Sequence, residues 1–433
     1  MISGLVARSG STTPMKRVAL ASFVGTAIEF YDFVVYGTAA ALVFPRVFFP
    51  DLGQTASAVA AFAAFAVAFF SRPLGAAFFG HFGDRIGRKK TLVVTLLIMG
   101  LSTFAVGLVP PASAIGSIAP ASVVILRLLQ GFAVGGEWAG SALLSAEHAP
   151  AARRGAYGMF TQLGVVAGGV VANLVFLLVN CTIGEKSSAF MSWGWRLPFL
   201  LSALLVWVAL VVRLRLAETP VFVAQQKRDC ISKVPFGELC RSQLRQVMLA
   251  TGVMFATFTL AFMANTYLMG YANSRLGHPR NLVLGVGIVG GLAGMTMIAV
   301  SASLCDRLGR RRLIVFGLAL ALPWSFTIMP LLNTGSPVLF AVGIVGTYAI
   351  VGVFTGPLAS FLPEIFATRY RYTGVGLAYN LGGIVGGAVP PIVAGPLLAA
   401  FGSWAIGSMM AVLVSVSLVC AYSLPETRNR SLS

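Results

Sequence analysis

The sequence contains few charged residues, which make up 10% of its 433 positions, whereas hydrophobic residues make up 57%. Because a soluble surface carries about 25–35% charge, this composition excludes a chain of ordinary soluble domains. Acidic residues are the scarcest, with 13 Asp and Glu against 31 Lys and Arg and a net charge of +18. Such a basic balance can indicate nucleic-acid binding. Here the apolar composition favours a membrane protein whose basic residues gather on one side.

Cysteine and histidine are also scarce, and their positions exclude several kinds of site. The five cysteines are scattered and odd in number, so they indicate neither a disulfide framework nor a metal site: Cys181, Cys230, Cys240, Cys305 and Cys420. The three histidines, His81, His148 and His278, fall at or near the ends of apolar runs. No histidine is therefore expected to carry a proton inside a membrane.

Motifs for enzymatic chemistry are missing as well. The sequence has no Gly-x-x-x-x-Gly-Lys-Ser/Thr loop, which argues against an ATP-driven pump. It also shows no set of nucleophile, base and orienting residue, no metal-ligand cluster and no cofactor-binding loop. We therefore expect a protein that is not an enzyme and that has no cofactor, no metal and no nucleic-acid partner.

Long apolar runs dominate the chain, and twelve of them reach the roughly 20 residues that a membrane-spanning helix needs. They cover residues 18–44, 56–80, 91–110, 120–145, 155–180, 193–214, 246–272, 281–304, 312–332, 337–362, 373–400 and 402–423. The first run is too long for the apolar region of a signal peptide, and no clean cleavage site follows it. The sequence therefore predicts an all-α polytopic membrane protein with twelve transmembrane helices.

The basic residues indicate the orientation of these helices. With both termini inside, 24 of the 31 Lys and Arg residues fall in cytoplasmic segments and five in outer segments. Arg72 and Arg127 lie inside helices, and Arg213 is counted with the cytoplasmic set. By the positive-inside rule we expect a multi-pass protein of the plasma (cytoplasmic) membrane with both termini cytoplasmic. Abundant alanine and an excess of arginine over lysine are typical of a GC-rich bacterial genome.

The chain divides into two halves around its longest polar stretch, residues 215–245, which is basic and falls midway. We expect an N-terminal six-helix bundle over residues 1–214, a cytoplasmic linker over residues 215–245 and a C-terminal six-helix bundle over residues 246–433. Three motif pairs, repeated in one order and on one side of the membrane, indicate that the unit is duplicated. They are Asp84-Arg85-Ile-Gly87-Arg88 with Asp306-Arg307-Leu-Gly309-Arg310, Glu147 and Arg154 with Glu364 and Arg371, and Glu218-Thr-Pro with Pro425-Glu426-Thr.

These motifs carry a resemblance to a known family. The Asp-Arg-x-Gly-Arg segments resemble the signature loops of the major facilitator superfamily, which implies two pseudo-symmetric six-helix bundles around a central cavity. A narrower resemblance is to the metabolite:proton symporters, which include carriers of α-ketoglutarate, citrate, shikimate and proline or betaine. It rests on Glu29-Phe-Tyr31-Asp32-Phe, Ser71-Arg72-Pro73-Leu-Gly75, Arg127-Leu-Leu-Gln130-Gly131, Gly135-Gly136-Glu137-Trp138, Trp193-Gly-Trp195-Arg196 and Arg369-Tyr-Arg371-Tyr372. None of these motifs identifies the substrate.

In this superfamily the signature residues form a charged layer that ties the two halves together on the cytoplasmic side. The resemblance implies this gating role for Asp84, Arg85, Arg88, Glu147, Arg154, Asp306, Arg307, Arg310, Glu364 and Arg371. Charges near water can pair and separate at modest energetic cost, which suits a contact that is broken once in each cycle. Lys89, Lys90 and Arg312 are better explained by the positive-inside rule alone.

Five charged residues lie away from the ends of the apolar runs, and a charge near the bilayer centre costs several kcal/mol. At a rise of about 1.5 Å per residue, Glu29 lies about 16 Å and Arg72 about 12 Å from the cytoplasmic edge. Asp32 and Arg127 both lie at about 21 Å, and Glu137 lies at about 6 Å. These depths permit two ion pairs across one cavity, Glu29 with Arg72 and Asp32 with Arg127. The alternative is that such pairs only lock helices together, and for Glu137 the two interpretations are evenly balanced.

The four deeper charges point to a mechanism of coupling. Burial favours the neutral form of a carboxyl group and a nearby arginine favours the charged form, so Asp32 or Glu29 is able to take up a proton. Protonation leaves Arg72 or Arg127 without a counter-charge, and a guanidinium can grip a substrate carboxylate with two hydrogen bonds. Asp32 is favoured as the proton carrier because its depth is nearer the outer side, with Glu29 second and Glu137 as the remaining candidate.

Neutral polar residues within the runs are candidates to complete a substrate site. They are Tyr31, Gln130, Gln162 and Asn173 in the first half and Asn265, Tyr267, Tyr379 and Asn380 in the second. For each of them, a structural hydrogen bond is the alternative explanation.

The sequence therefore predicts a proton-coupled symporter that imports a small organic acid (a mono-, di- or tricarboxylate) by alternating access. One alternative is a proton symporter for a zwitterion such as proline or betaine, because a site of zero net charge also suits a zwitterion. A second alternative is an uncoupled facilitator. We expect a monomer in membrane lipid, with the small anion or zwitterion as its ligand and the proton as its coupling ion.

Overall fold

The computed structural model describes residues 15–184, 187–227, 235–428 and 430. Over these residues the chain is almost entirely helical, and twelve helical segments are long and apolar enough to cross a membrane. The predicted all-α architecture with twelve transmembrane helices is therefore confirmed. Large apolar side chains such as Phe70, Leu101, Val338 and Trp404 are exposed, as expected for helices that face lipid.

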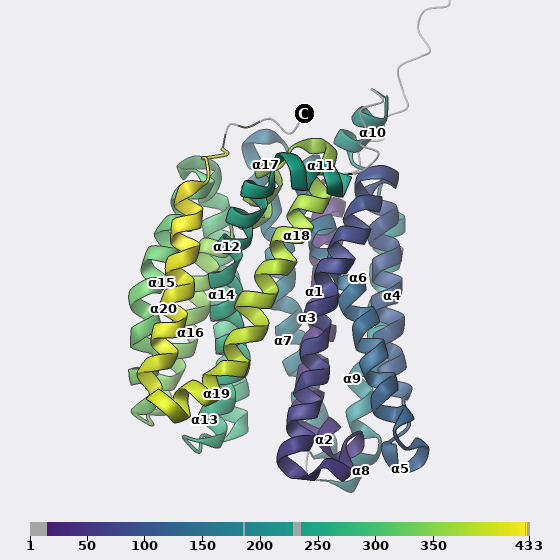
Figure 1. The fold of residues 1–433 in the computed structure, drawn as a ribbon, viewed down its shortest axis with the longest axis vertical. Coiled ribbons are helices and arrows are strands. Elements are labelled where there is room, and N and C mark those ends of the chain that lie inside the picture. The colour runs from purple at the N-terminus through teal and green to yellow at the C-terminus, as the bar shows by residue number, and fades with distance from the viewer. Residues whose placement is uncertain (1–14, 185–186, 228–234, 429, 431–433) are drawn as a thin grey trace, which may run out of the picture.

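Six of the long segments belong to the first half of the chain (Figure 1). They are α1 (Met15–Leu42), α3 (Gly53–Ile86), α4 (Arg88–Leu108), α6 (Ile118–His148), α7 (Arg154–Ile183) and α9 (Leu197–Leu214). Short helices lie between them: α2 (Phe44–Val47), η1 (Pro50–Leu52), α5 (Ala112–Ile115), η2 (Ala151–Arg153), α8 (Ser188–Ser192) and η3 (Gly194–Arg196).

The other six long segments belong to the second half, and two of them contain a π-helical stretch. They are α12 (Leu244–Phe262) with η4 (Met263–Leu268) and α13 (Met269–Ser274); α14 (Arg280–Leu308); α15 (Arg310–Asn333); α16 (Pro337–Thr355) with α17 (Leu358–Ile365); η5 (Thr368–Tyr370) with α18 (Arg371–Gly383), η6 (Ile384–Ala388) and α19 (Val389–Phe401); and α20 (Ser403–Ser423). The short helices α10 (Pro220–Lys227) and α11 (Pro235–Ser242) lie between the halves in sequence. Residues 228–234 of the predicted linker are outside the described residues, and the boundaries at 214 and 246 stay a prediction.

The two sets of six helices stand side by side as two bundles (Figure 1). Across their interface α7 packs on α14 and α3 packs on α18. One hydrophobic core continues through this interface, because Phe33, Phe69 and Trp138 of the first bundle cluster with Phe262 and Tyr379 of the second. The bundles are therefore held together by apolar packing as well as by the polar contacts described below.

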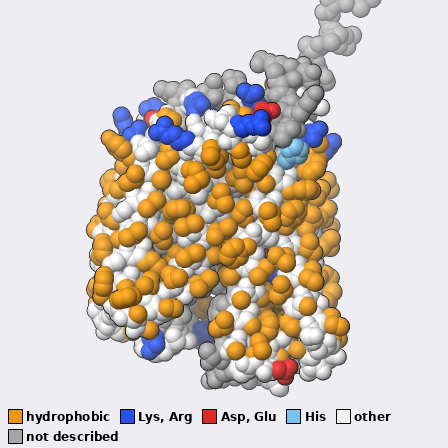
Figure 2. All heavy atoms as spheres, in the orientation of Figure 1, with side chains coloured by type: hydrophobic (Ala, Val, Ile, Leu, Met, Phe, Trp, Pro, Cys, Tyr) orange, Lys and Arg blue, Asp and Glu red, His pale blue; other side chains and the backbone are white. Residues whose placement is uncertain are grey.

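The end of the molecule that carries residues 84–90 and 306–312 is called the basic end. Figure 2 shows Lys and Arg side chains gathered along this upper edge, while hydrophobic side chains cover the flanks. At the opposite, lower edge the surface is hollowed between the two bundles (Figure 2). The two ends of the interface are therefore packed differently.

The two signature motifs are pairs of helix ends joined by a single glycine, and not the loops that the resemblance implied. Helix α3 continues through Asp84 to Ile86, and α4 begins at Arg88. Between them Gly87 has a φ of 114°, and Gly309 of the second motif has a φ of 104°. Because residues with a Cβ rarely adopt these angles, glycine is what permits both tight turns.

Candidate functional site

The four deep charges identified in the sequence lie together inside the first bundle. Glu29 and Asp32 come from α1, Arg72 from α3 and Arg127 from α6. Each of these side chains belongs to a residue that is at most 3% exposed. They line a cavity of about 10 Å³, which is the size of a single water site. This cavity is called the charged pocket.

Two glycines bring α3 and α6 close enough to form the charged pocket. A Cβ atom at Gly75 would lie 1.8 Å from the carbonyl oxygen of Phe132. A Cβ atom at Gly135 would lie 2.2 Å from the carbonyl oxygen of Arg72. Since only small residues allow helix backbones to approach this closely, the position of Arg72 beside α6 depends on these glycines.

The two ion pairs that the helix depths permitted are not formed. Among the described residues, no arginine nitrogen lies within the 4.0 Å limit of an ion pair from an oxygen of Glu29 or Asp32. Both carboxylate oxygens of Glu29 are buried and have no hydrogen-bond partner in the part of the chain that the structure describes. The charges therefore share one pocket without direct contact.

Aromatic rings, and not carboxylates, hold the two guanidinium groups in place. The Arg72 guanidinium lies 4.9 Å from the ring centre of Phe33 and 4.8 Å from that of Phe69. The Arg127 guanidinium lies 4.0 Å from the ring centre of Tyr36. A cation–π contact occupies the face of a guanidinium and leaves its N–H edge available for a ligand.

A chain of hydrogen bonds connects Asp32 to Arg127 indirectly. The Thr103 hydroxyl donates to Asp32 Oδ2 at 2.8 Å, and Gln130 Nε2 donates to the Thr103 hydroxyl at 2.7 Å. Arg127 Nη1 then donates to Gln130 Oε1 at 3.2 Å. Gln130, predicted as a substrate contact, thus connects the two charges. Sequence reasoning missed Thr103, because a threonine in an apolar helix carries no signal that separates it from a structural residue.

Arg213, which was counted with the cytoplasmic set, is buried in the last turn of α9. Arg213 is 2% exposed, its guanidinium pairs with Glu137, and it also donates to the carbonyl oxygen of Leu92 at 2.8 Å. The Thr95 hydroxyl donates to the other oxygen of Glu137 at 2.7 Å. Because both oxygens of Glu137 are occupied, the structural interpretation of this residue is favoured over a role in proton coupling.

A larger cavity lies between the two bundles and is called the central cavity. Its volume is about 120 Å³, and its walls come from α1 and α7 of the first bundle and from α12, η4, α14, α16 and α18 of the second. None of the described residues that line it is charged. The polar residues of the wall are Gln162, Asn173, Thr257, Asn265, Tyr348, Thr355 and Tyr379.

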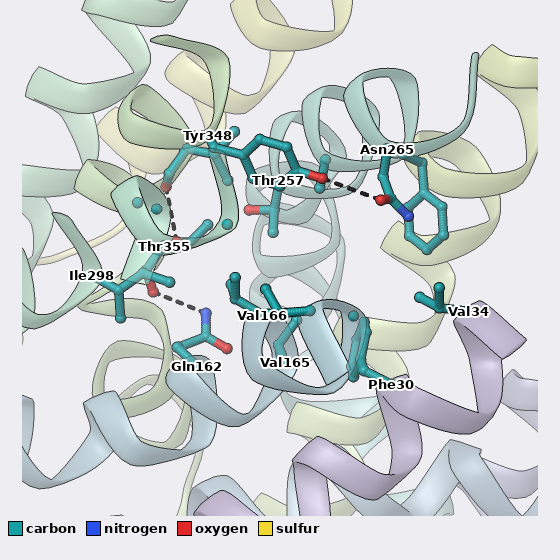
Figure 3. Close-up of a pocket in the computed structure, with 18 of the residues that line it drawn as sticks. Phe30, Val34, Gln162, Val165, Val166, Thr257, Asn265, Ile298, Tyr348 and Thr355 are labelled. Atoms are coloured by element: carbon teal, nitrogen blue, oxygen red, sulfur yellow. Dashed lines mark hydrogen bonds between the residues drawn. The ribbon is translucent and has the colours of Figure 1, made fainter. Parts of the chain in front are cut away.

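Several polar groups of this wall are already paired with one another (Figure 3). Gln162 Nε2 donates to the carbonyl oxygen of Thr355 at 2.9 Å, and the Tyr348 hydroxyl donates to Asn265 Oδ1 at 3.2 Å. The buried hydroxyl of Thr257 has no partner among the described residues. Thr257 therefore lines the cavity while its hydroxyl is buried.

Phe33 is shared by the charged pocket and the central cavity, and no other described residue lines both. Its ring centre lies 5.2 Å from the Arg127 guanidinium, in addition to its contact with Arg72. The ring also makes a T-shaped contact with Phe262 of the second bundle, with centroids 5.2 Å apart. The Phe33 ring therefore stands between the charges and the central cavity.

The neutral candidates from the sequence fall into two groups. Gln162, Asn173, Asn265 and Tyr379 line the central cavity, and Gln130 lines the charged pocket. Tyr31, Tyr267 and Asn380 line neither cavity and instead donate to the carbonyl oxygens of Pro198, Ala394 and Gly135, respectively. These three contacts are structural, so the structure does not place Tyr31, Tyr267 and Asn380 where a substrate in either cavity would touch them.

At the basic end, two aspartates cap helices of the opposite bundle. Asp84 accepts hydrogen bonds from the backbone N–H groups of Tyr372 and Thr373 at the start of α18, at 3.2 and 3.1 Å. Asp306 accepts two such bonds, both at 3.0 Å, from the first turn of α7. A helix N-terminus favours an anion, so each carboxylate ties one bundle to the other.

The repeated glutamates form matching buried triads, Arg88–Glu147–Arg371 and Arg310–Glu364–Arg154. The nitrogen–oxygen distances are 3.4 and 3.5 Å in the first triad and 3.4 and 3.8 Å in the second. In each triad the third residue belongs to the opposite bundle. The layer that the resemblance implied is thus present as a set of contacts, while its role as a gate stays a prediction.

Two of the ten predicted gating residues lie outside this layer, because Arg85 and Arg307 are exposed. The glutamates of the third repeated motif, Glu218 and Glu426, bind the starts of two helices. Glu218 accepts from the first backbone N–H group of α4 at 3.0 Å, and Glu426 accepts from that of α15 at 2.9 Å. Each carboxylate therefore caps the helix that follows a signature turn.

Two six-helix bundles with repeated contacts and a cavity between them define a multi-pass membrane transporter. The model of the Major Facilitator Superfamily matches residues 22–391, and the chain belongs to that superfamily. The resemblance seen in the sequence is therefore confirmed. The family and the relatives are transporters and not enzymes, which also agrees with the expectation from the sequence.

Relatives of the chain are bacterial transporters of similar length. It is 41% identical to the inner membrane metabolite transport protein YhjE of Escherichia coli K12, over 96% of this chain and 95% of that protein. It is 38% identical to the shikimate transporter of the same organism, over 91% and 90% of the two chains. It is 32% identical to the proline/betaine transporter of Salmonella typhimurium, over 96% and 85%. The proton:xylose symporter XylE bound to 6-bromo-6-deoxy-D-glucose has the same fold, with a TM-score of 0.76, 19% identity and coverage of 96% and 97%.

Proposed function

We propose that this transporter is a proton-coupled symporter that imports a small organic acid by alternating access. The observation that supports this proposal is the charged pocket, where two acids and two arginines lie buried without ion pairs beside the central cavity. Buried charges that only hold helices together are expected to pair directly, as Glu137 and Arg213 do. Charges that are near one another but unpaired suit the exchange of a proton and an anion.

The balance of charge in this pocket supplies the coupling. With all four groups ionised the net charge is zero, and protonation of one carboxyl group leaves a net charge of +1. That charge attracts a substrate carboxylate toward an arginine. Because the bound anion in turn favours the protonated acid, each ligand increases the affinity for the other. The proton and the organic acid are then carried together.

Hydrogen bonding favours Glu29 over Asp32 as the proton carrier. Asp32 accepts a hydrogen bond from Thr103, which stabilises its charged form. Neither oxygen of Glu29 has a donor among the described residues. The depth of Asp32 along its helix favoured that residue, whereas these contacts make Glu29 the better candidate.

We assign the basic end to the cytoplasm on the positive-inside rule. With this orientation, the aspartate caps and the glutamate triads close the cytoplasmic side of the interface. The hollow at the lower edge of Figure 2 then faces outward. In this state the central cavity is placed to receive substrate and protons from outside, and transport requires the layer at the basic end to separate.

An organic acid and a zwitterion are the two substrate classes that the uptake test below has to separate. Among the relatives, one transporter is named for shikimate and others for proline and betaine, so the names alone allow both classes. No described residue that lines the central cavity is charged, so its wall offers a counter-charge neither to a carboxylate nor to the cationic group of a zwitterion. An uncoupled facilitator would have no need of two buried acids.

Uptake of a panel of labelled acids into proteoliposomes, with and without an inward proton gradient, tests the proposal. We expect accumulation that a protonophore abolishes. A facilitator would still equilibrate its substrate after the gradient has collapsed. Uptake of betaine without uptake of any organic acid would support the zwitterion alternative.

A second test concerns Arg72, which we propose as an anchor for the substrate carboxylate. Arg72→Ala is expected to abolish uptake at near-normal expression in the membrane. Arg72→Lys is not expected to restore it, because an ammonium group lacks the planar fork that binds a carboxylate with two hydrogen bonds. Uptake by Arg72→Ala at the native rate would contradict this assignment.

A further inference from the structure

Two faces of α1 line different cavities, and Phe33 lies between these faces. Glu29 and Asp32 line the charged pocket only, whereas Phe30 and Val34 line the central cavity only (Figure 3). Successive residues of an α-helix are turned by about 100° around its axis. At this spacing the direction of Phe33 falls about 40° from that of Glu29 and about 60° from that of Phe30. One side chain of α1 is therefore placed to reach both cavities.

Aromatic rings of both bundles hold the Phe33 ring in this place. Its centroid lies 4.7 Å from that of Phe65 and 5.4 Å from that of Phe69, and both of these residues are on α3. The contact from the second bundle comes from Phe262, the last residue of α12. Because alternating access moves one bundle against the other, the support of this ring changes during a transport cycle.

With the Phe33 ring in this place, the charged pocket is too small for a carboxylate group. Its volume of about 10 Å³ is enough for one water molecule. The other described residues that line it all belong to α1, α3, α4 and α6 of the first bundle. A ligand that comes from the central cavity therefore meets the Phe33 ring before it meets Arg72 or Arg127.

We propose that the Phe33 side chain is a barrier that keeps the charged pocket closed to the central cavity, and that its movement admits the proton and the anion. This inference rests on the proposed function and assigns the control of access to the same site. Without the barrier, water in the central cavity would reach Glu29 at all times, and a proton would be able to bind in the absence of substrate. Phe33 therefore limits the entry of protons that are not accompanied by substrate.

Labelling of a cysteine in the charged pocket tests the barrier directly. Ala68→Cys, in the full-length protein without its native cysteines, provides the thiol, because Ala68 lines this pocket and is 1% exposed. The reagent is methyl methanethiosulfonate, which is small and uncharged, and the labelled fraction is followed by mass spectrometry. We expect Phe33→Ala to increase the labelling rate about tenfold or more, because the aromatic contacts that hold the ring are lost. Phe33→Leu should increase it less, and an unchanged rate in both variants would overturn the inference.

Phe30→Ala is the matched control, because Phe30 is an aromatic residue of the same helix that lines the central cavity but not the charged pocket. It should leave the labelling rate of Ala68→Cys at that of the parent protein. Equal acceleration by Phe30→Ala and Phe33→Ala would overturn the inference, since any enlargement of the central cavity would then have the same effect. Midpoints of thermal unfolding are measured in parallel, and the comparison is made with Phe33→Leu if Phe33→Ala is the less stable variant.

Entry of protons into proteoliposomes in the absence of substrate tests the consequence for coupling. With an inward proton gradient and a pH-sensitive dye inside, Phe33→Ala is expected to admit protons faster than the parent protein and Phe30→Ala do. Proton entry in Phe33→Ala no faster than in Phe30→Ala would contradict control of proton access by Phe33.

These measurements separate failure of the inference from failure of the proposed function, because labelling of Ala68→Cys needs neither substrate nor a gradient. Faster labelling in Phe33→Ala, together with native uptake that is insensitive to the proton gradient, would support the barrier and contradict the proposed function. Equal labelling in Phe33→Ala and the parent protein, together with proton-driven uptake by the native protein, would contradict the inference alone.

Discussion

At the scale of single residues, two buried glutamates of the first bundle have opposite surroundings. Glu137 pairs with Arg213 and accepts a hydrogen bond from Thr95. Neither oxygen of Glu29 has a partner in the part of the chain that the structure describes. Since donors and cations stabilise the charged form of a carboxyl group, Glu137 is suited to hold helices together and Glu29 to exchange a proton.

Glu29→Gln is expected to separate binding from coupling, because glutamine imitates the permanently protonated state. The variant should still exchange substrate across proteoliposome membranes but fail to accumulate it on an inward proton gradient. In the native protein substrate affinity should rise as the pH falls, since the protonated acid frees an arginine for the anion. This pH dependence should disappear in Glu29→Gln.

Asp32→Asn is the comparison for this experiment, since Asp32 shares the charged pocket but has Thr103 as a hydrogen-bond donor. It is expected to keep gradient-driven accumulation at a reduced rate. Loss of accumulation in Asp32→Asn and retention in Glu29→Gln would reverse the assignment of the two acids. Retention in both variants would show that the proton travels by another route.

Glu137→Gln is expected to act on stability and not on coupling. The change leaves the buried Arg213 guanidinium without its counter-charge, and breaking a buried pair in this way costs about 3–5 kcal/mol. We expect a lower midpoint of thermal unfolding in detergent, with proton coupling retained by the folded fraction. The double variant Glu137→Gln/Arg213→Met should be more stable than the single one. A Glu137→Gln protein as stable as the native one would contradict a structural role.

At the scale of helices, the N-termini of α7 and α18 are held by carboxylates from the opposite bundle. Asp84 binds the start of α18 through two backbone N–H groups and one hydroxyl, that of Thr373 at 2.9 Å. Asp306 binds the start of α7 through two backbone N–H groups. These helix caps are therefore contacts that must break when the bundles separate at the basic end.

Asp84→Asn and Asp306→Asn are expected to weaken closure of the basic end, because a neutral amide binds a helix N-terminus less strongly than an anion does. In a background without the native cysteines, Ala359→Cys provides a buried reporter beside the layer. Both aspartate variants should increase its rate of labelling by a maleimide applied from the side of the basic end. Arg85→Ala is the control, because Arg85 is exposed and outside the layer. Equal labelling rates in all three backgrounds would argue against a gating role.

At the scale of the whole molecule, the two bundles meet through equivalent contacts. A Cβ atom at Gly376 of α18 would lie 3.4 Å from Cβ of Ala76 on α3. At the other interface a Cβ atom at Gly158 of α7 would lie 3.5 Å from Cβ of Ala359 on α17. Both distances are close to the roughly 3.5–4.5 Å between the Cβ atoms of a disulfide. Each interface therefore offers a site for a covalent lock.

Ala76→Cys/Gly376→Cys, with the native cysteines removed, is expected to stop transport when it is oxidised, because the disulfide holds the basic end closed. A reducing agent should restore uptake, and each single variant should be insensitive to oxidant. Gly158→Cys/Ala359→Cys should behave in the same way at the second interface. Uptake at the native rate by fully cross-linked protein would show that this end does not open during transport.

The membrane architecture and the pairing of the motifs could be predicted from the order of residues along the chain. Backbone groups in lipid must be satisfied within a helix, so twelve long apolar runs require twelve spanning helices. The spacing of the repeats also placed Asp84 and Asp306 in equivalent positions, and both cap the opposite bundle. These features depend only on the composition and on the order of residues along the chain, and the amino-acid sequence gives both.

Which buried groups contact one another depends on the packing of the helices and could not be predicted from the order of residues. Sequence position gives the depth of a residue along its helix, but its rotation and its neighbours depend on how all the helices pack together. For this reason Glu29 and Arg72 share a depth without pairing, and Arg213, counted at the membrane edge, reaches Glu137 inside the bundle. Phe33 became the boundary between two cavities in the same way, because its place depends on contacts from three helices of both bundles.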